Sequence, residues 1–128
     1  MVIKRVLCRQ RLRRVPCRFS WIDHRLVRDR HICRCSANAL ALYLFLVTVG
    51  DADGLSYYSD GTIGQLLSMD PIALARARQE LIGASLVAYE KPLYQVLSLE
   101  DPAPVPRQPS QGPARLGQLL FDMLGKKP

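Results

Sequence analysis

The residues of this sequence that are best suited to chemistry are arginines grouped near the N-terminus. Five of them are Arg9, Arg11, Arg13, Arg14 and Arg18. A guanidinium group keeps its positive charge in proteins, and its N–H donors fit the oxygen atoms of a phosphate. We therefore expect this segment to follow a phosphate backbone or to enter the minor groove of double-stranded DNA.

A second group of candidate binding residues lies on a helix that is expected to begin after Asp70 and to reach about residue 84. Asp is favoured as an N-cap, and Pro is favoured at the first helical position. Three apolar side chains at helical spacing face the core, namely Leu74, Ala77 and Leu81. The opposite face then presents Pro71, Ile72, Ala73, Ala75, Arg76 and Gln79.

Such a helix fits the major groove of B-DNA, where its outer side chains meet the edges of the bases. Arg76 is suited to guanine, Gln79 to adenine, and Ala73 to the methyl group of thymine. Arg78 lies nearer the buried side, where we expect it to pair with Glu80, Asp60 or the backbone.

The charges are distributed unevenly. Residues 1–36 contain 11 Lys and Arg and 2 acidic residues, giving +9, whereas residues 37–100 contain 3 basic and 7 acidic residues, giving −4. Residues 101–128 add +2, for a total of +7. Because an acidic segment repels phosphates, we expect the N-terminal arm to supply most of the attraction to a polyanion.

Metal binding and catalysis have less support. The possible soft ligands are Cys8, Cys17, Cys33, Cys35, His24 and His31, and their spacing does not fit the ligand pairs of structural zinc sites. We therefore predict free thiols, no metal and no cofactor. The sequence contains no Gly-x-Ser-x-Gly motif, no catalytic-cysteine signature and no Gly-rich phosphate loop, so no enzymatic activity is expected.

The remaining pattern predicts an α+β protein that is mainly α, with a small β-hairpin. The arm is expected to be extended or to form a short strand. It leads into a short helix that Asp23 caps, and the apolar contacts of this helix are Trp21, Ile22, Leu26 and Val27. Helical residues 37–49 follow, with Ser36 before them and Gly50 as the stop, and residues 55–58 form a strand.

The second half of this core should contain two more helices and the hairpin. Ser59 caps a helix to about residue 67 that buries Ile63, Leu66 and Leu67. The helix after Asp70 comes next, and residues 86–89 and 93–99 form the hairpin. Lys91 is the only cation at the hairpin tip.

Helix, strand, helix, turn, helix and hairpin is the order of a winged helix-turn-helix, and residues 59–99 resemble that family. The matching apolar positions are Ile63, Leu67, Met69, Leu74 and Leu81, followed by Ser85-Leu86-Val87 at the end of the recognition helix. With residues 16–21 and 35–37, the chain resembles over residues 15–99 the N-terminal domains of phage, plasmid and other mobile-element replication initiators, including DnaD-type proteins. Ser68 and Ser85 stand where the family usually has Gly, at positions that often need a positive φ, so strain or a different turn shape is expected there.

This resemblance implies a DNA-binding protein of a mobile element that acts in replication initiation or transcriptional regulation. The alternative is a winged helix that binds other proteins of a replication or transposition assembly. We expect four parts: a basic arm with a short helix (1–35), the winged-helix core (36–99), a Pro-rich linker (100–113) and an amphipathic helix (114–128). The last helix presents Leu116, Leu119, Leu120, Met123 and Leu124 to a protein partner.

The apolar run at residues 39–49 is too short to cross a membrane, which needs about 20 residues. Residues 1–16 contain no apolar stretch typical of a signal peptide. A cytoplasmic protein without a membrane partner is therefore expected. Because this helix is apolar all round, we also expect a second surface to cover it: the C-terminal helix, the N-terminal arm or a second copy in a homodimer.

Overall fold

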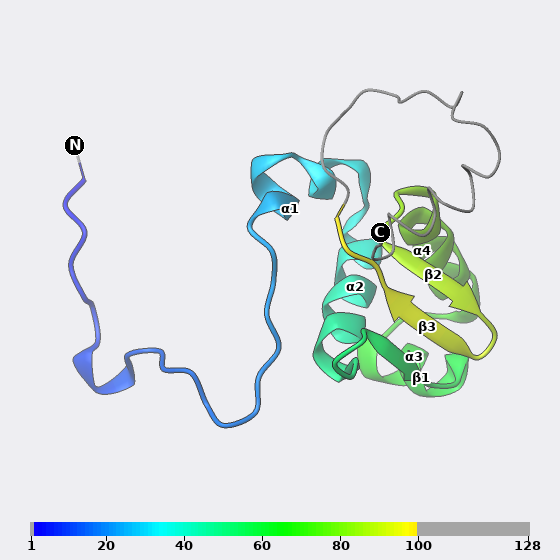
Figure 1. The fold of residues 1–128 in the computed structure, drawn as a ribbon, viewed down its shortest axis with the longest axis horizontal. Helices are drawn as coiled ribbons and strands as arrows, with labels where there is room; N and C mark the ends of the chain where they lie inside the picture. Colours follow the sequence, from blue (N-terminus) through cyan, green and yellow to red (C-terminus); the bar gives the residue numbers. More distant parts are fainter. Residues whose placement is uncertain (1, 100–128) are drawn as a thin grey trace, which may run out of the picture. The chain divides into compact units, whose positions relative to one another are not determined.

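The computed structural model describes residues 2–99, which form an α+β arrangement of helices around a small sheet (Figure 1). The predicted α+β class is therefore confirmed. Two short 3-10 helices, Arg9–Arg11 and His31–Arg34, lie before the core. In chain order, the main elements are α1 (Arg25–Arg28), α2 (Ala37–Val49), β1 (Leu55–Tyr57), α3 (Asp60–Leu67), α4 (Pro71–Gly83), β2 (Val87–Glu90) and β3 (Leu93–Val96).

The sheet has the strand order β1-β3-β2 and is antiparallel throughout. Its central strand β3 is the last in the sequence, and Tyr94 of this strand lies opposite Ser56 of β1 and Tyr89 of β2. Side chains alternate along β3, so that Tyr94 is buried while Leu93 and Gln95 are exposed. One face of the sheet therefore closes the core.

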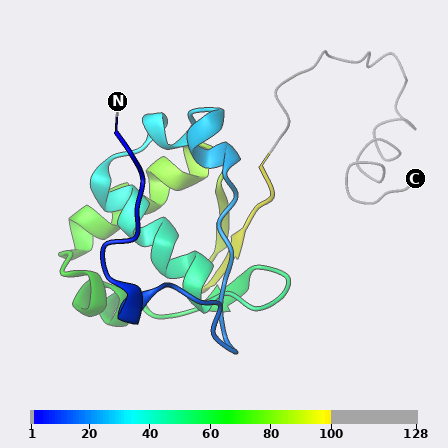
Figure 2. The same ribbon diagram turned by 90° about the vertical axis from the view of Figure 1, so that its left-hand side faces the viewer.

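The core lies between the sheet and three helices. α2 packs against α4 and β3, and α4 also packs against α3 and β2 (Figure 2). The largest side chains that are fully buried are Leu42, Leu46, Ile63, Leu74, Leu81, Leu86, Val87 and Tyr94. These residues lie on α2, α3, α4 and β3 and at the start of β2. Burying them together fixes α4 against the sheet and the other two helices.

Three helices begin at the residues that the sequence indicates. The Oγ atoms of Ser36 and Ser59 accept hydrogen bonds from the backbone N–H groups three residues later, at 3.2 and 3.1 Å. The Asp70 carboxylate does the same at 2.7 Å. These caps satisfy donors that would lack partners at a helix start, and the predicted starts of α2, α3 and α4 are confirmed.

The turn between α3 and α4 depends on a left-handed residue. Ser68 has φ 58° and ψ 47°, and the N–H groups of Ser68 and Met69 both donate to the carbonyl oxygen of Gly64. A Cβ at Gly64 would lie 2.7 Å from the Met69 carbonyl oxygen, so this turn needs glycine at position 64. Ser85, after α4, has φ 61°. Both positive φ values expected from the sequence are confirmed, and both are adopted by serine.

Four apolar residues that we expected to be buried are exposed. Trp21, Ile22 and Val27 are 74%, 52% and 67% exposed, because α1 is a single turn that buries only Leu26. Leu66 is 62% exposed, on a flank of α3 that no element of residues 2–99 covers. Of the two states expected for the arm, extended or a short strand, the strand is not observed, since residues 2–22 contain no strand and only the one 3-10 helix.

The apolar helix α2 is largely covered within the described part of the chain. It buries Leu42, Tyr43 and Leu46, and Phe45 packs edge to face on Tyr58 with ring centres 5.2 Å apart. Leu44 is its one exposed large apolar side chain, at 55%. α4 and β3 therefore provide most of the cover that we expected from a second surface.

The predicted linker and C-terminal helix, residues 100–128, lie outside the described residues. Residues up to Ser98 form one compact unit. Within residues 2–99, no helix has both the length and the apolar composition needed to span a membrane.

Candidate nucleic-acid interface

The outer face of α4 is the centre of the candidate interface. The cap at Asp70 and the burial of Leu74, Ala77 and Leu81 fix the rotation of the helix. Arg76 and Gln79 are both exposed, as predicted, and their i, i+3 spacing places them on one face. Ala73 differs, because it is half-buried and its methyl group is only partly available. The exposed part of this face also includes Pro71, Ile72 and Ala75.

Arg78, two residues after Arg76, is turned away from this face. Its Nη1 donates to Asp60 Oδ1 at 2.9 Å and to Tyr94 Oη at 2.8 Å, and its guanidinium lies 4.5 Å from the ring centre of Tyr89. Its side chain is only 12% exposed. Of the three partners that the sequence left open, Asp60 is the one observed, and Arg78 joins α4 to α3 and to both strands of the hairpin.

The protonation of these groups follows from their burial and pairing. Burial disfavours the charged form of Arg78, but the hydrogen bonds to Asp60 and Tyr94 outweigh it and raise the pKa of the guanidinium. Burial also raises the pKa of the Tyr94 hydroxyl, against the opposing effect of Arg78. Arg78 is therefore a cation that donates hydrogen bonds to the neutral phenol of Tyr94 and to the carboxylate of Asp60.

A second attachment of α4 involves Glu80. Its carboxylate accepts hydrogen bonds from Ser36 N at 2.7 Å and from Ser36 Oγ at 3.0 Å. Ser36 is the N-cap of α2, so this contact joins the start of α2 to the second half of α4. Glu80, one of the three alternatives for Arg78, is held by Ser36 instead.

The acidic residues near α4 are therefore engaged with the protein itself. Asp60 pairs with Arg78, Asp70 caps α4 and Glu80 binds Ser36. None of these three carboxylates lacks a partner. On the exposed face of α4, Arg76 is the only ionised side chain among Pro71, Ile72, Ala75, Arg76 and Gln79.

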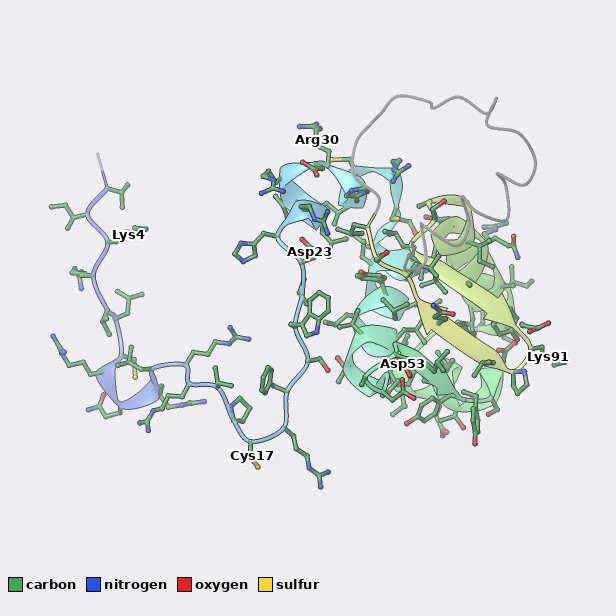
Figure 3. All side chains as sticks on the ribbon, viewed as in Figure 1. Lys4, Cys17, Asp23, Arg30, Asp53 and Lys91 are labelled. Carbon is green, nitrogen blue, oxygen red and sulfur yellow. The ribbon has the colours of Figure 1, made fainter. Side chains whose placement is uncertain are left out.

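The hairpin carries the predicted cation at its tip. Lys91 lies between β2 and β3 and is exposed, where Figure 3 labels it at the end of the hairpin. Glu90, its neighbour in the chain, is also exposed. Lys91 is thus available to a phosphate, but the tip has no net positive charge.

The five arginines that we expect to bind phosphates are all exposed, namely Arg9, Arg11, Arg13, Arg14 and Arg18. Residues 2–22 contain seven Lys and Arg and no acidic residue. Within residues 2–99, none of these basic side chains forms an ion pair. Their charges are therefore available to a polyanion.

Sequence reasoning placed Ile72 on the outer face of α4 but missed the exposure of Leu66 on α3. Ile72, in the first turn of α4, is 68% exposed, and Leu66 of α3 is 62% exposed. The outward position of Ile72 follows from its helical spacing. The exposure of Leu66 does not, because it lies between Ile63 and Leu67 in the sequence and both of these match the core pattern.

The four cysteines are free thiols, and Cys8, Cys17 and Cys33 are exposed. Burial is the main cause that raises the pKa of the partly buried Cys35, and Glu80 adds to it. In the part of the chain that the structure covers, no three His, Cys, Asp or Glu side chains come together as a metal site would require.

The chain matches no family model, no curated protein and no solved structure. The geometry of α3, α4, the hairpin and the arm therefore carries the functional argument alone.

Proposed function

We propose that residues 36–99 act as a winged helix-turn-helix that binds double-stranded DNA without enzymatic activity. The observation that carries this proposal is the contrast between two arginines of α4. Arg78 is fixed to Asp60, Tyr94 and Tyr89, while Arg76 is exposed together with Gln79. A helix held in this way by its inner side chains can present its outer side chains to the major groove.

The order α2-β1-α3-α4-β2-β3, with β3 in the middle of the sheet, supports the assignment of α3 and α4 as the two helices of the motif. Arg76 and Gln79 would then hydrogen-bond guanine and adenine. Lys91 and the arginines of the arm would bind phosphates, which position the protein and supply most of the affinity. The resemblance to replication initiators suggests replication initiation or transcriptional regulation on a mobile element as the process.

The test is the binding of the full chain to fluorescently labelled random duplex DNA, measured by anisotropy at several salt concentrations. We expect binding that weakens steeply with salt, because the arm releases counterions from the DNA. Selection of bound duplexes from a random pool should then enrich a short motif that contains guanine and adenine. No detectable binding to duplex DNA at low salt would overturn the proposal.

The second candidate is a winged helix that binds proteins of a replication or transposition assembly. It is favoured by the exposure of Leu66 and Ile72, because large apolar side chains on a surface are typical of protein interfaces. The substitutions Leu66→Ala and Ile72→Ala, which add no charge, separate the two candidates. They should leave duplex binding intact if only Arg76, Gln79 and the cations contact DNA, and they should abolish a protein interface centred on these side chains.

A further inference from the structure

Two aromatic rings at the end of the arm are largely exposed. Phe19 is 65% exposed and Trp21 is 74% exposed. Neither ring stacks on another aromatic side chain within residues 2–99, where the ring contacts are Phe45 with Tyr58 and Tyr89 with Tyr94. Leaving rings of this size in water forgoes the stabilisation that their burial would give. They are therefore available to an external ligand.

The residue between these rings is held on the domain. Ser20 Oγ donates to the carbonyl oxygen of Thr48, near the end of α2, at 3.3 Å. The chain between Cys17 and Asp23 is part of no helix or strand (Figure 3). If this segment becomes extended when it binds a strand, Phe19 and Trp21 point to the same side and lie about 6.5 to 7 Å apart, as residues i and i+2 do in extended chains. Stacked bases lie about 3.4 Å apart, so two rings at twice this spacing can hold one base between them.

The surroundings of the rings are strongly basic. Arg13, Arg14 and Arg18 precede them in the sequence, and all three are exposed. Between Met1 and Ile22 there is no acidic residue. Aromatic rings that stack on bases, next to cations that bind the phosphates between them, are the combination by which proteins bind single-stranded nucleic acids. In a duplex the bases are already stacked on one another and their faces are not accessible, so this combination selects unpaired strands.

We infer that residues 13–21 form a binding site for an unpaired nucleic-acid strand, in which Phe19 and Trp21 stack on a base and Arg13, Arg14 and Arg18 bind the phosphates. The stacking site on Phe19 and Trp21 is separate from the face of α4 that we propose to contact duplex bases, although Arg13, Arg14 and Arg18 are among the arginines that we propose to bind duplex phosphates. The same protein would then contact the bases of paired DNA through α4 and an unpaired base through Phe19 and Trp21.

Trp21 is the only tryptophan of the chain, so its fluorescence reports on this site alone. The full chain is titrated with a short oligothymidylate, a short oligouridylate and an abasic phosphodiester of the same length. We expect both oligonucleotides to quench Trp21 emission, because a stacked base is in contact with the indole, and the abasic polymer to bind without quenching it. The two oligonucleotides also show whether the site prefers DNA or RNA.

Phe19→Leu and Trp21→Leu should each weaken binding of labelled oligothymidylate by about tenfold, measured by anisotropy. The matched control is Leu7→Ala, which alters another exposed apolar residue of the same arm outside residues 13–21 and should change the affinity by less than about twofold. Because these side chains are exposed, the variants should keep the circular dichroism spectrum of the parent chain. Both Leu variants should keep the affinity for duplex DNA.

Three results would overturn the inference. The first is equal affinity for the abasic polymer and the oligonucleotide, with Trp21 emission unchanged in both. The second is an equal loss of duplex and single-strand binding in the two Leu variants, which would make the rings a general contact. The third is binding of the full chain to phosphatidylserine vesicles with no binding to oligonucleotides, which would assign the apolar and basic arm to a lipid surface. A failure of α4 to bind duplex DNA leaves the first and third of these measurements unaffected.

Discussion

Arg78 of α4 and Asp60 of α3 form an ion pair in which Nη1 and Oδ1 lie 2.9 Å apart, and the arginine is the more buried partner. The same guanidinium donates to Tyr94 and lies over the ring of Tyr89. One side chain therefore holds together the two helices of the proposed motif and both strands of the hairpin.

Removal of this arginine should destabilise the domain. Arg78→Met leaves the Tyr94 hydroxyl without its partner and removes the cation over Tyr89, so we expect the free energy of unfolding to fall by about 1 to 3 kcal/mol. Asp60→Asn should cost about 1 kcal/mol, because Asp60 is half exposed and its pairing is screened by water. Urea denaturation measures both values. Asp53→Asn, which alters an exposed acid outside this group, is the control and should have little effect.

Arg76 should determine specificity and not overall affinity. If it binds a guanine through two hydrogen bonds, Arg76→Ala should lose about 1 to 3 kcal/mol of discrimination at one base position of the selected site. Competition between the selected duplex and its single-base variants measures this loss. Gln79→Ala should relax a different position. An equal loss of affinity on every sequence would instead identify Arg76 as a phosphate contact.

Deletion of residues 2–18 should flatten the salt dependence of duplex binding. The deletion removes seven cations that form no ion pair within the described chain. If four to six of them bind phosphates, the slope of log K against log salt should decrease by about 4 to 5. Lys91→Ala is the single-site comparison and should decrease the slope by about 1. A slope that does not change on deletion would show that the arm does not contact the DNA.

Ser68→Gly and Ser85→Gly should stabilise the protein, because both serines have a positive φ that a side chain disfavours. The greater freedom of glycine in the unfolded state offsets part of this gain, so we expect a net increase of about 0.5 to 1 kcal/mol in the free energy of unfolding for each change. The expected rise in melting temperature is about 2 to 8 °C for each variant. Gly64→Ala is the opposite test and should destabilise, since its Cβ would lie 2.7 Å from a carbonyl oxygen. A melting temperature lowered by Ser68→Gly would contradict this account of the turn.

Cys35 should react with iodoacetamide more slowly than the three exposed cysteines. Burial raises the pKa of its thiol, and the thiolate is the reactive form. Because the thiol stays protonated until the pH approaches this raised pKa, the alkylation rate of Cys35 should rise at higher pH than that of an exposed cysteine. Peptide mass spectrometry follows each cysteine separately. Glu80→Gln removes a charge that contributes to the raised pKa and should shift the Cys35 profile to lower pH.

The helices and the turn between α3 and α4 were predictable because they depend on local signals. Ser36, Ser59 and Asp70 are caps, and each side chain binds the N–H group three residues ahead of it, a relationship that is visible in the sequence. The outward position of Arg76 follows from the helical period of Leu74 and Leu81 in the same way.

The remaining features depend on contacts between residues that are distant in the sequence. The hydrogen bonds of Glu80 to Ser36 join residues that are 44 positions apart in the sequence. The pairing of Arg78 with Asp60 depends on how α3, α4 and β3 are placed relative to one another. The exposure of Trp21 and Leu66 also could not be predicted, since apolar type and spacing do not show whether another element covers a side chain.

The central strand of the sheet is the last one to be synthesised. β1 and β2 each pair only with β3 in the described sheet, so neither has a partner until residues 93–96 have left the ribosome. A nascent chain that stops before Leu93 contains every helix of the domain but no sheet to close the core around Leu42 and Leu81. Synthesis of the hairpin's second strand is therefore the step that allows the whole domain to fold.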